Sequence, residues 1–298
     1  MDIKKYINKD YIPDQNTCSE IEDLNNQKED LSNFNLQEAQ LEKIYLVNAK
    51  MTSCNLSKAN LKNASMFEAD LSNSNLFKAN LEGANLKNAN LERCNLLGAN
   101  LSNAKLENVK WGKDYKVINE LEAEDAYKAG DIKLANEKYR EAEEIYRAIK
   151  ISMQSQTLGD ETGEFFIREM IAKRKQFKKF SAARIGSRVI EITTGYGEKL
   201  SNILFTVIGI IITCMLLYGI QGVSYGDTVI GFFSTDYDLL TTLGQLLYFS
   251  VVVYSTVGFG EMIPIGPLGK TVMMFEGIAG GLVLAILIIA LYKKTMDR

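Results

Sequence analysis

Residues 255–261 read STVGFGE, and the two glycines in this run, Gly258 and Gly260, decide how the segment folds. Glycine adopts backbone conformations that a Cβ atom resists, so glycines at every second position allow successive carbonyl groups to point the same way. Four such strands around one axis would form rings of carbonyl oxygens that replace the water around a dehydrated cation. The run therefore predicts an ion site that is lined by backbone when several copies assemble.

This run resembles the selectivity filter of potassium channels, which usually reads TVGYG and is followed by Asp. The residues that match it are Thr256, Val257, Gly258, Phe259 and Gly260. The resemblance implies that the carbonyls of the first four bind K⁺ as the permeant ion, with the Thr256 hydroxyl at the inner end. It also implies that Glu261 holds negative charge at the outer mouth. Phe259 keeps an aromatic ring but lacks the hydroxyl of Tyr, so the rigidity of the filter stays open.

The stretch before this run is apolar but short. Residues 239–254 cannot cross about 30 Å of hydrocarbon as a helix, because that takes about 20 residues. A short helix that enters a membrane and returns through non-helical backbone is tolerated where protein buries it or where it lines water. We therefore expect a pore helix over 239–254, with its carbonyl end towards the pore. Thr193–Glu198 reads TTGYGE but lacks the Val and a preceding pore helix, so we interpret it as a turn.

Two longer apolar stretches flank the pore helix, and we expect transmembrane helices over 200–222 and 268–292. Bases lie before the first stretch and after the second, whereas the loop from Gln221 to Pro267 contains acids and no base. Bases mark the cytosolic ends of membrane helices, so both termini are expected in the cytosol. Pro264 and Pro267 suit a loop that leads out of the filter.

Helix, pore helix, filter and helix in this order resemble the minimal pore of the two-transmembrane potassium channels, from about Lys199 to Lys294. The resemblance implies a homotetramer that crosses the bilayer of the cell membrane, since one chain supplies one filter strand. The first membrane stretch has no ladder of arginines, so no voltage sensor is expected.

The second membrane stretch carries one acid, Glu276, within the run FEGIAG over 275–280. An ionised carboxylate at the bilayer centre costs about 2.5–3.5 kcal/mol, so this side chain is expected to face protein or water. Two interpretations stay open, a hydrogen-bond partner behind the filter or the pore helix and a pH- or cation-sensitive group near the cavity. The run resembles the inner helix of two-helix potassium channels, which implies that Gly277 or Gly280 is the hinge of the gate.

A different period governs the first third of the chain. From Leu31 to Trp111 a large apolar residue recurs at every fifth position, and a small residue lies two positions before most of these. Neither a helix, with a period of 3.6, nor a strand, with a period of 2, accounts for this pattern. A square solenoid does, with one pentad on each side, two inward side chains per pentad and coils about 4.8 Å apart.

The five-residue period resembles the pentapeptide-repeat family, whose fold is a right-handed quadrilateral β-helix. The resemblance covers residues 29–113 and implies roughly four coils, with Trp111 as the plug of the last. Some members of that family mimic DNA with a strongly acidic surface. Between Glu29 and Lys113, however, nine acids are opposed by ten bases, so neither DNA mimicry nor a nucleic-acid partner is expected.

The other segments before the membrane stretches are polar. Residues 1–28 are expected to form a lead-in or cap. Residues 114–180 have a helical period and include a stretch similar to a tetratricopeptide hairpin. We interpret them as a helical cap and spacer, with a partner-binding module as the alternative. Residues 181–199 continue a basic run that begins at Lys173, and we expect a juxtamembrane linker that touches lipid headgroups.

The composition argues against several functions. The chain has 298 residues, a net charge of −3, no His, and four Cys without CxxC spacing. Imidazole ligands and His bases are therefore absent, and reduced thiols are expected. Because the sequence shows no metal-ligand cluster, nucleophile–base pair or intact phosphate loop, we expect neither an enzyme nor a cofactor.

The sequence as a whole predicts a mixed fold in which a β-helix and a helical module precede an all-α pore with two transmembrane helices. The predicted function is a potassium-selective channel that a cytosolic protein or ligand regulates through the repeat domain. Two alternatives stay open. One is a membrane-anchored interaction scaffold whose solenoid is the working part, and the other is a weakly selective cation channel. The sequence does not identify the stimulus that opens the gate.

Overall fold

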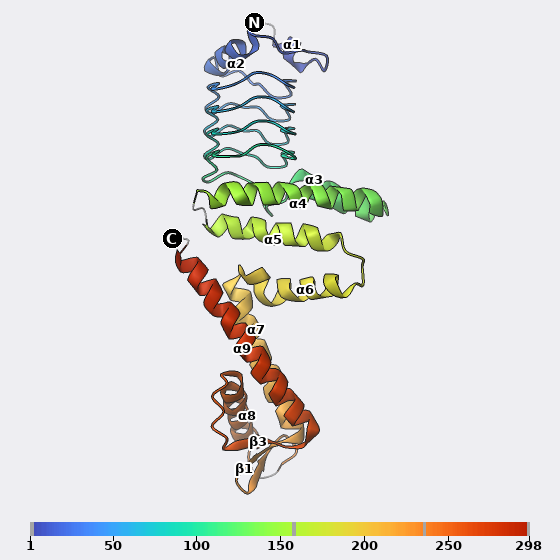
Figure 1. Cartoon of the computed structure of the whole chain (residues 1–298), viewed down its shortest axis with the longest axis vertical. Coiled ribbons are helices and arrows are strands. Elements are labelled where there is room, and N and C mark those ends of the chain that lie inside the picture. The colour runs from blue at the N-terminus through green and yellow to red at the C-terminus, as the bar shows by residue number, and fades with distance from the viewer. Residues whose placement is uncertain (1–2, 157–158, 235–236, 297–298) are drawn as a thin grey trace. The chain divides into compact units, whose positions relative to one another are not determined.

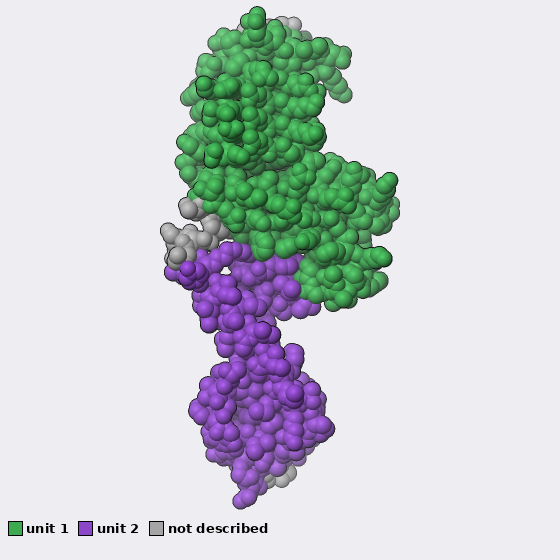
Figure 2. All heavy atoms as spheres, in the orientation of Figure 1, with its two compact units in different colours: residues 1–187, 297–298 green, residues 188–296 purple. Residues whose placement is uncertain are grey.

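The computed structural model describes residues 3–156, 159–234 and 237–296, which fall into two compact units (Figure 1). One unit is built on residues up to 187 and the other on residues 188–296 (Figure 2). The buried apolar side chains of each unit pack among themselves, so each unit has a core of its own.

The first unit is built around a β-helix over residues 31–110 (Figure 1). Parallel β-bridges join residues 20 positions apart, such as Asn35 with Asn55 and Asn90 with Lys110. Four pentads therefore make one coil, and the stack has four coils. This is the β-helix that the five-residue period predicts.

Each pentad turns a corner and points two side chains inwards. The corner residue has a positive φ, as at Asn63 with 57°, and Asn tolerates this left-handed conformation better than most residues do. The large and the small positions are both buried, as at Leu71 and Ala84. Burial raises the pKa of the Cys54 and Cys94 thiols to about 12, so both are protonated core side chains.

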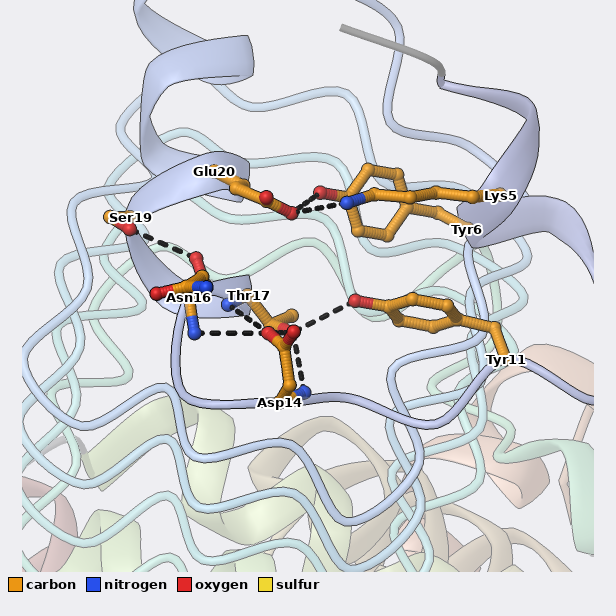
Figure 3. Close-up of polar contacts among 8 residues, drawn as sticks. All are labelled: Lys5, Tyr6, Tyr11, Asp14, Asn16, Thr17, Ser19 and Glu20. Atoms are coloured by element: carbon orange, nitrogen blue, oxygen red, sulfur yellow. Dashed lines mark hydrogen bonds and ion pairs between the residues drawn. The ribbon is translucent and has the colours of Figure 1, made fainter.

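Two short helices, α1 (Lys4–Ile7) and α2 (Thr17–Asn26), cover the first coil. Tyr6 is buried and stacks on Phe34 of that coil, with the ring centroids 5.0 Å apart. Its hydroxyl donates a hydrogen bond to Glu20 of α2, within the polar network that Figure 3 shows. The segment before the repeats thus caps the exposed end of the solenoid.

Three helices, α3 (Ile118–Lys128), α4 (Ile132–Gln154) and α5 (Gly159–Lys175), follow the last coil. Helices α4 and α5 add side chains to the core of the β-helix, whereas α3 packs against α4. Trp111 is buried at this end and packs edge-on against Phe165 of α5, with the ring centroids 5.0 Å apart.

Polar groups also join α4 and the residues after it to the last coil. The Ser152 hydroxyl donates to the Leu101 carbonyl at 2.8 Å, and the Gln156 side chain donates to the Ala104 carbonyl at 2.6 Å. These bonds satisfy carbonyls that have no further coil to pair with.

A helix, α6 (Ala182–Thr194), occupies most of the segment expected to be a linker over 181–199. The expectation of a linker assigned no secondary structure to this segment. Ile185, Val189 and Ile192 recur at helical spacing, a pattern that the many bases of the segment obscure. The TTGYGE run follows as a single 3₁₀ turn, η1 (Gly195–Gly197), in agreement with its interpretation as a turn.

The second unit contains three apolar helices, α7 (Leu200–Gln221), α8 (Leu239–Tyr254) and α9 (Gly266–Met296). Helices α7 and α9 are long and apolar enough to cross a membrane, whereas α8 is shorter. Helix α9 extends beyond both ends of the expected span 268–292. Pro267 lies in its first turn and not in a loop, because proline fits the start of a helix without losing a hydrogen bond.

A small sheet joins the loops of this unit. Its strands are β1 (Val223–Tyr225), β2 (Thr228–Ile230) and β3 (Met262–Pro264), in the order β2-β1-β3 with antiparallel pairing. Val223 faces Ile230 on one side and Pro264 on the other. The sheet therefore ties the chain after α7 to the chain before α9.

Candidate functional site

Helix α8 leads directly into the STVGFGE segment. Asp238 caps its N-terminus, accepting hydrogen bonds from the backbone N–H groups of Leu240 at 3.2 Å and Thr241 at 3.3 Å, and from the Thr241 hydroxyl at 2.6 Å. These bonds, the hydroxyl first among them, lower the pKa of Asp238, so its carboxylate is ionised at neutral pH. The helix ends at Tyr254, and its carbonyl end, with partial negative charge, adjoins Ser255.

Alternate residues of the segment have left-handed backbone conformations. The φ angles of Thr256, Gly258 and Gly260 are 58°, 53° and 79°. Glycine adopts such angles freely, whereas a β-branched residue such as Thr adopts them rarely. The Thr256 N–H donates to the Val253 carbonyl at 3.0 Å, which carries the turn out of α8.

The segment is exposed in the single chain. Every residue from 256 to 261 is exposed, including two large apolar side chains, Val257 at 56% and Phe259 at 64%. Exposed apolar side chains gathered on a short segment mark a surface that another molecule covers.

The C-terminal end of the segment is fixed by side-chain and backbone contacts. The Tyr248 hydroxyl of α8 donates to the Glu261 carboxylate at 3.2 Å. Strand β3 follows at Met262 and pairs with β1. Behind the segment lies a small cavity of about 70 Å³, lined on the α8 side by Phe249 and on the α9 side by Met273.

Glu276 lies at the meeting point of all three helices. Its side chain is fully buried, and its Oε2 accepts a hydrogen bond from the Tyr218 hydroxyl of α7 at 2.7 Å. Its Oε1 lies 2.5 Å from the Ser250 hydroxyl of α8. The structure thus places Glu276 among hydrogen-bonding groups behind α8, which is the first of its two predicted positions.

The two hinge candidates on α9 have different surroundings. A Cβ on Gly280 would overlap the backbone carbonyl of Tyr254, so this glycine allows α9 to pack closely on the end of α8. A Cβ on Gly277 would meet nothing within 4 Å.

The groups that the segment offers are oxygen atoms. They are the backbone carbonyls of residues 256–259 and the Thr256 hydroxyl, which suit a hard cation such as K⁺. Among residues 3–156, 159–234 and 237–296, no group of three or more His, Cys, Asp or Glu side chains could hold a metal ion.

Three residues that support the site were not predicted, namely Tyr218, Ser250 and Tyr248. They are polar residues within apolar stretches, and such residues in a membrane segment usually have a specific partner. That signal was present in the sequence, but it does not identify the partner.

Two family models match separate parts of the chain. The model for pentapeptide repeats matches eight copies over residues 35–73 and 74–110, within the β-helix. The model described as an ion channel matches residues 220–296, which contain α8, the STVGFGE segment and α9.

Solved structures of pentapeptide repeat proteins also match the chain. A protein from the cyanobacterium Cyanothece 51142 is 44% identical over 28% of this chain and 58% of its own, with a TM-score of 0.28. HetL from the cyanobacterium Nostoc sp. strain PCC 7120, a pentapeptide repeat protein involved in heterocyst differentiation regulation, is 34% identical. That match covers 28% of this chain and 38% of HetL, with a TM-score of 0.27. The chain therefore spans less than two thirds of either protein. No curated protein matches the chain.

Proposed function

We propose that this chain, in which pentapeptide repeats precede an ion-channel domain, is one subunit of a potassium-selective channel that four copies form around one pore. The observation that carries the proposal is the STVGFGE segment between α8 and β3. Its alternate residues at 256, 258 and 260 have positive φ, and residues 256–261 are exposed in a single chain. Four copies would cover this surface and surround one line of ions.

In this assembly the backbone carbonyls of each copy would bind dehydrated K⁺. They belong to Thr256, Val257, Gly258 and Phe259, with the Thr256 hydroxyl at the inner end. The carbonyl end of α8 would add negative potential below them. Glu261 at the outer end, together with Asp227 and Asp238 in the same connecting region, would raise the local concentration of cations.

The helix lengths and the charges at their ends support a membrane setting with both termini in the cytosol. Helix α7 has 22 residues, which corresponds to about 33 Å and thus to the hydrocarbon thickness. Lys293 and Lys294 lie in the last turn of α9, and the residues before α7 are basic. Bases in these places face the cytosol.

Helix α6 supports contact with the cytosolic lipid surface. Its side chains Ile185, Val189 and Ile192 recur at helical spacing and are exposed, and the same helix carries Arg184 and Arg188. An exposed apolar stripe together with bases suits the boundary between anionic headgroups and acyl chains.

The cytosolic unit is proposed to regulate the pore. It holds a β-helix and helices α1 to α5, and its charged groups include buried ones such as Glu120 and Glu169. A protein or ligand that binds this unit better in one state of the gate would shift the channel towards that state.

The first experiment is K⁺ flux from liposomes that contain the purified full-length chain, compared with flux in Na⁺ alone. We expect flux that prefers K⁺, and we expect this preference to disappear in Gly258→Ala. Equal flux of K⁺ and Na⁺ would favour a weakly selective channel, for which the missing hydroxyl at Phe259 gives a reason. Absence of flux, both in the full chain and after deletion of residues 1–180, would favour a membrane-anchored scaffold.

A further inference from the structure

The carboxyl group of Glu276 joins three helices through a short chain of hydrogen bonds. Tyr218 of α7 donates to Oε2 at 2.7 Å, and the Ser250 oxygen lies 2.5 Å from Oε1. The same Ser250 oxygen lies 2.9 Å from the carbonyl oxygen of Ile211, on α7. Ser250 therefore lies between a carboxyl group on one helix and a backbone carbonyl on another.

The protons available to these contacts can be counted. A serine hydroxyl carries one proton, and a backbone carbonyl carries none. The contact between Ser250 and Ile211 is a hydrogen bond only if Ser250 donates its proton there. The contact between Ser250 and Glu276 then needs a second proton, and the remaining source is Oε1 of Glu276.

The surroundings of Glu276 favour the same protonation state. Its side chain is fully buried, and the ion pairs among the described residues do not include it. The titratable groups that face it are Tyr218 and Cys214 on α7 and Tyr254 on α8, all neutral when protonated. Burying an ionised carboxylate without a nearby cation costs free energy. Burying a neutral carboxylic acid costs much less when its proton is donated in a hydrogen bond.

We propose that Glu276 is a neutral carboxylic acid that donates a hydrogen bond to Ser250 and thereby fixes α8 between α7 and α9. Glu276 is then a positioning residue, because its hydrogen bonds go to Tyr218 and Ser250, and Ser250 lies five residues before Ser255. The protonation state is independent of the proposed function, whereas its effect on selectivity rests on that function.

An infrared spectrum of the full-length chain in liposomes at neutral pH tests the protonation state. Subtracting the spectrum of Glu276→Gln from that of the unaltered chain should leave the carbonyl band of a carboxylic acid. Asp125→Asn is the matched control, since Asp125 is an exposed acid whose subtraction should leave carboxylate bands. Carboxylate bands from Glu276 would overturn the proposal.

Flux measurements on the same samples test the positioning role. Glu276→Gln keeps one donor and one acceptor in place, so the preference for K⁺ over Na⁺ should stay within about twofold of that of the unaltered chain. Glu276→Ala and Ser250→Ala each remove a buried hydrogen bond and should each lower the preference about tenfold. Ser201→Ala, which removes an exposed hydroxyl of α7, is the control and should change nothing.

The two proposals fail in different ways. A preference that Glu276→Ala leaves unchanged would overturn the positioning role while the channel itself works. Absence of flux both in the unaltered chain and in the chain without residues 1–180 would contradict the channel, and the infrared result would still decide whether Glu276 is neutral.

Discussion

At the scale of single residues, the site depends on backbone conformation more than on side-chain chemistry. Gly258 and Gly260 have φ angles of 53° and 79°, which an L side chain rarely adopts. Neither glycine has a neighbour within 4 Å of an added Cβ, so a side chain there would be strained by conformation and not by crowding in the single chain.

We predict that Gly258→Ala abolishes the preference for K⁺ without preventing expression or assembly. A left-handed alanine costs about 1–2 kcal/mol, so the segment should move to another conformation. The ratio of liposome flux in K⁺ to flux in Na⁺ measures the preference. The size of the purified complex checks that the variant still assembles.

The matched control is Gly244→Ala, in the middle of α8, where an added Cβ also meets nothing within 4 Å. Its conformation is helical, so alanine should stabilise α8 by up to about 1 kcal/mol and keep flux selective. A Gly258→Ala protein that still prefers K⁺ would contradict the conformational argument.

The sequence predicts the backbone part of this site but not its supports. Thr256 to Gly260 form a local motif, and local motifs are visible in one stretch of sequence. The bond from Tyr218 to Glu276 joins residues 58 positions apart, and Ser250 lies 26 positions from the same acid. Such pairs depend on how three helices pack, which no local pattern encodes.

At the scale of elements, helices α3, α4 and α5 meet around a buried acid. Glu120 of α3 accepts a hydrogen bond from the Tyr146 hydroxyl of α4, and the Arg168 guanidinium of α5 lies 3.6 Å from it. Burial outweighs these attractions and raises the pKa of Glu120 above its ordinary 4.5. The folded helices therefore hold this proton more tightly than the unfolded chain does.

The sign of the pH effect follows from that shift. As pH rises above about 4.5, unfolded chains lose the Glu120 proton first, so the free energy of unfolding falls until the raised pKa of the folded state is passed. We predict that Glu120→Gln removes this fall and raises the melting temperature of the unit at pH 7. Fluorescence of Trp111, the single Trp of the chain, reports on the unit because its ring contacts α5.

The control for this prediction is Glu124→Gln, one turn further along α3. Glu124 pairs with Lys116 at 2.8 Å and is more exposed, so its loss should lower the melting temperature slightly or leave it unchanged. If the melting temperature of Glu120→Gln at pH 7 is lower than that of the unaltered chain, the attraction of Arg168 for the Glu120 carboxylate outweighs the cost of burying it. That result would contradict the prediction.

Elements with strong periodicity were predicted, and short or mixed ones were not. The β-helix repeats its pattern in every coil, and α7 and α9 are long apolar runs. The strands β1, β2 and β3 have three residues each, too few to show an alternation. The linker expected over 181–199 received no secondary structure from the sequence, because bases and Gly186 interrupt the apolar stripe of α6.

At the scale of the whole molecule, the main core of the first unit and the core of the second share no residue among those that the structure describes. A unit with its own core keeps its fold when the other is removed, provided the cut avoids both. The connection between α5 and α6, near residue 180, is such a place.

We predict that deleting residues 1–180 changes the open probability of single channels and leaves the preference for K⁺ over Na⁺ intact. The reason is that the groups proposed to select the ion all lie in residues 238–276, whereas the deleted unit is proposed to bias the gate. Single-channel recordings in planar bilayers measure both quantities. An unchanged open probability would show that the repeat unit does not regulate the pore.

The bridge partners of the β-helix lie 20 residues apart, so 20 residues is the unit by which the stack grows or shrinks by a whole coil. An insertion of 20 residues adds one coil, which lengthens the stack by about 4.8 Å. Every later residue then lies on the same side of the β-helix as before. An insertion of five residues rotates everything after it by a quarter turn relative to the coils before it, so α4 would be rotated relative to α2. Insertions of one pentad and of a whole coil both keep the pairing of residues 20 positions apart, but only whole coils keep the helices at the two ends of the stack in the same relative orientation.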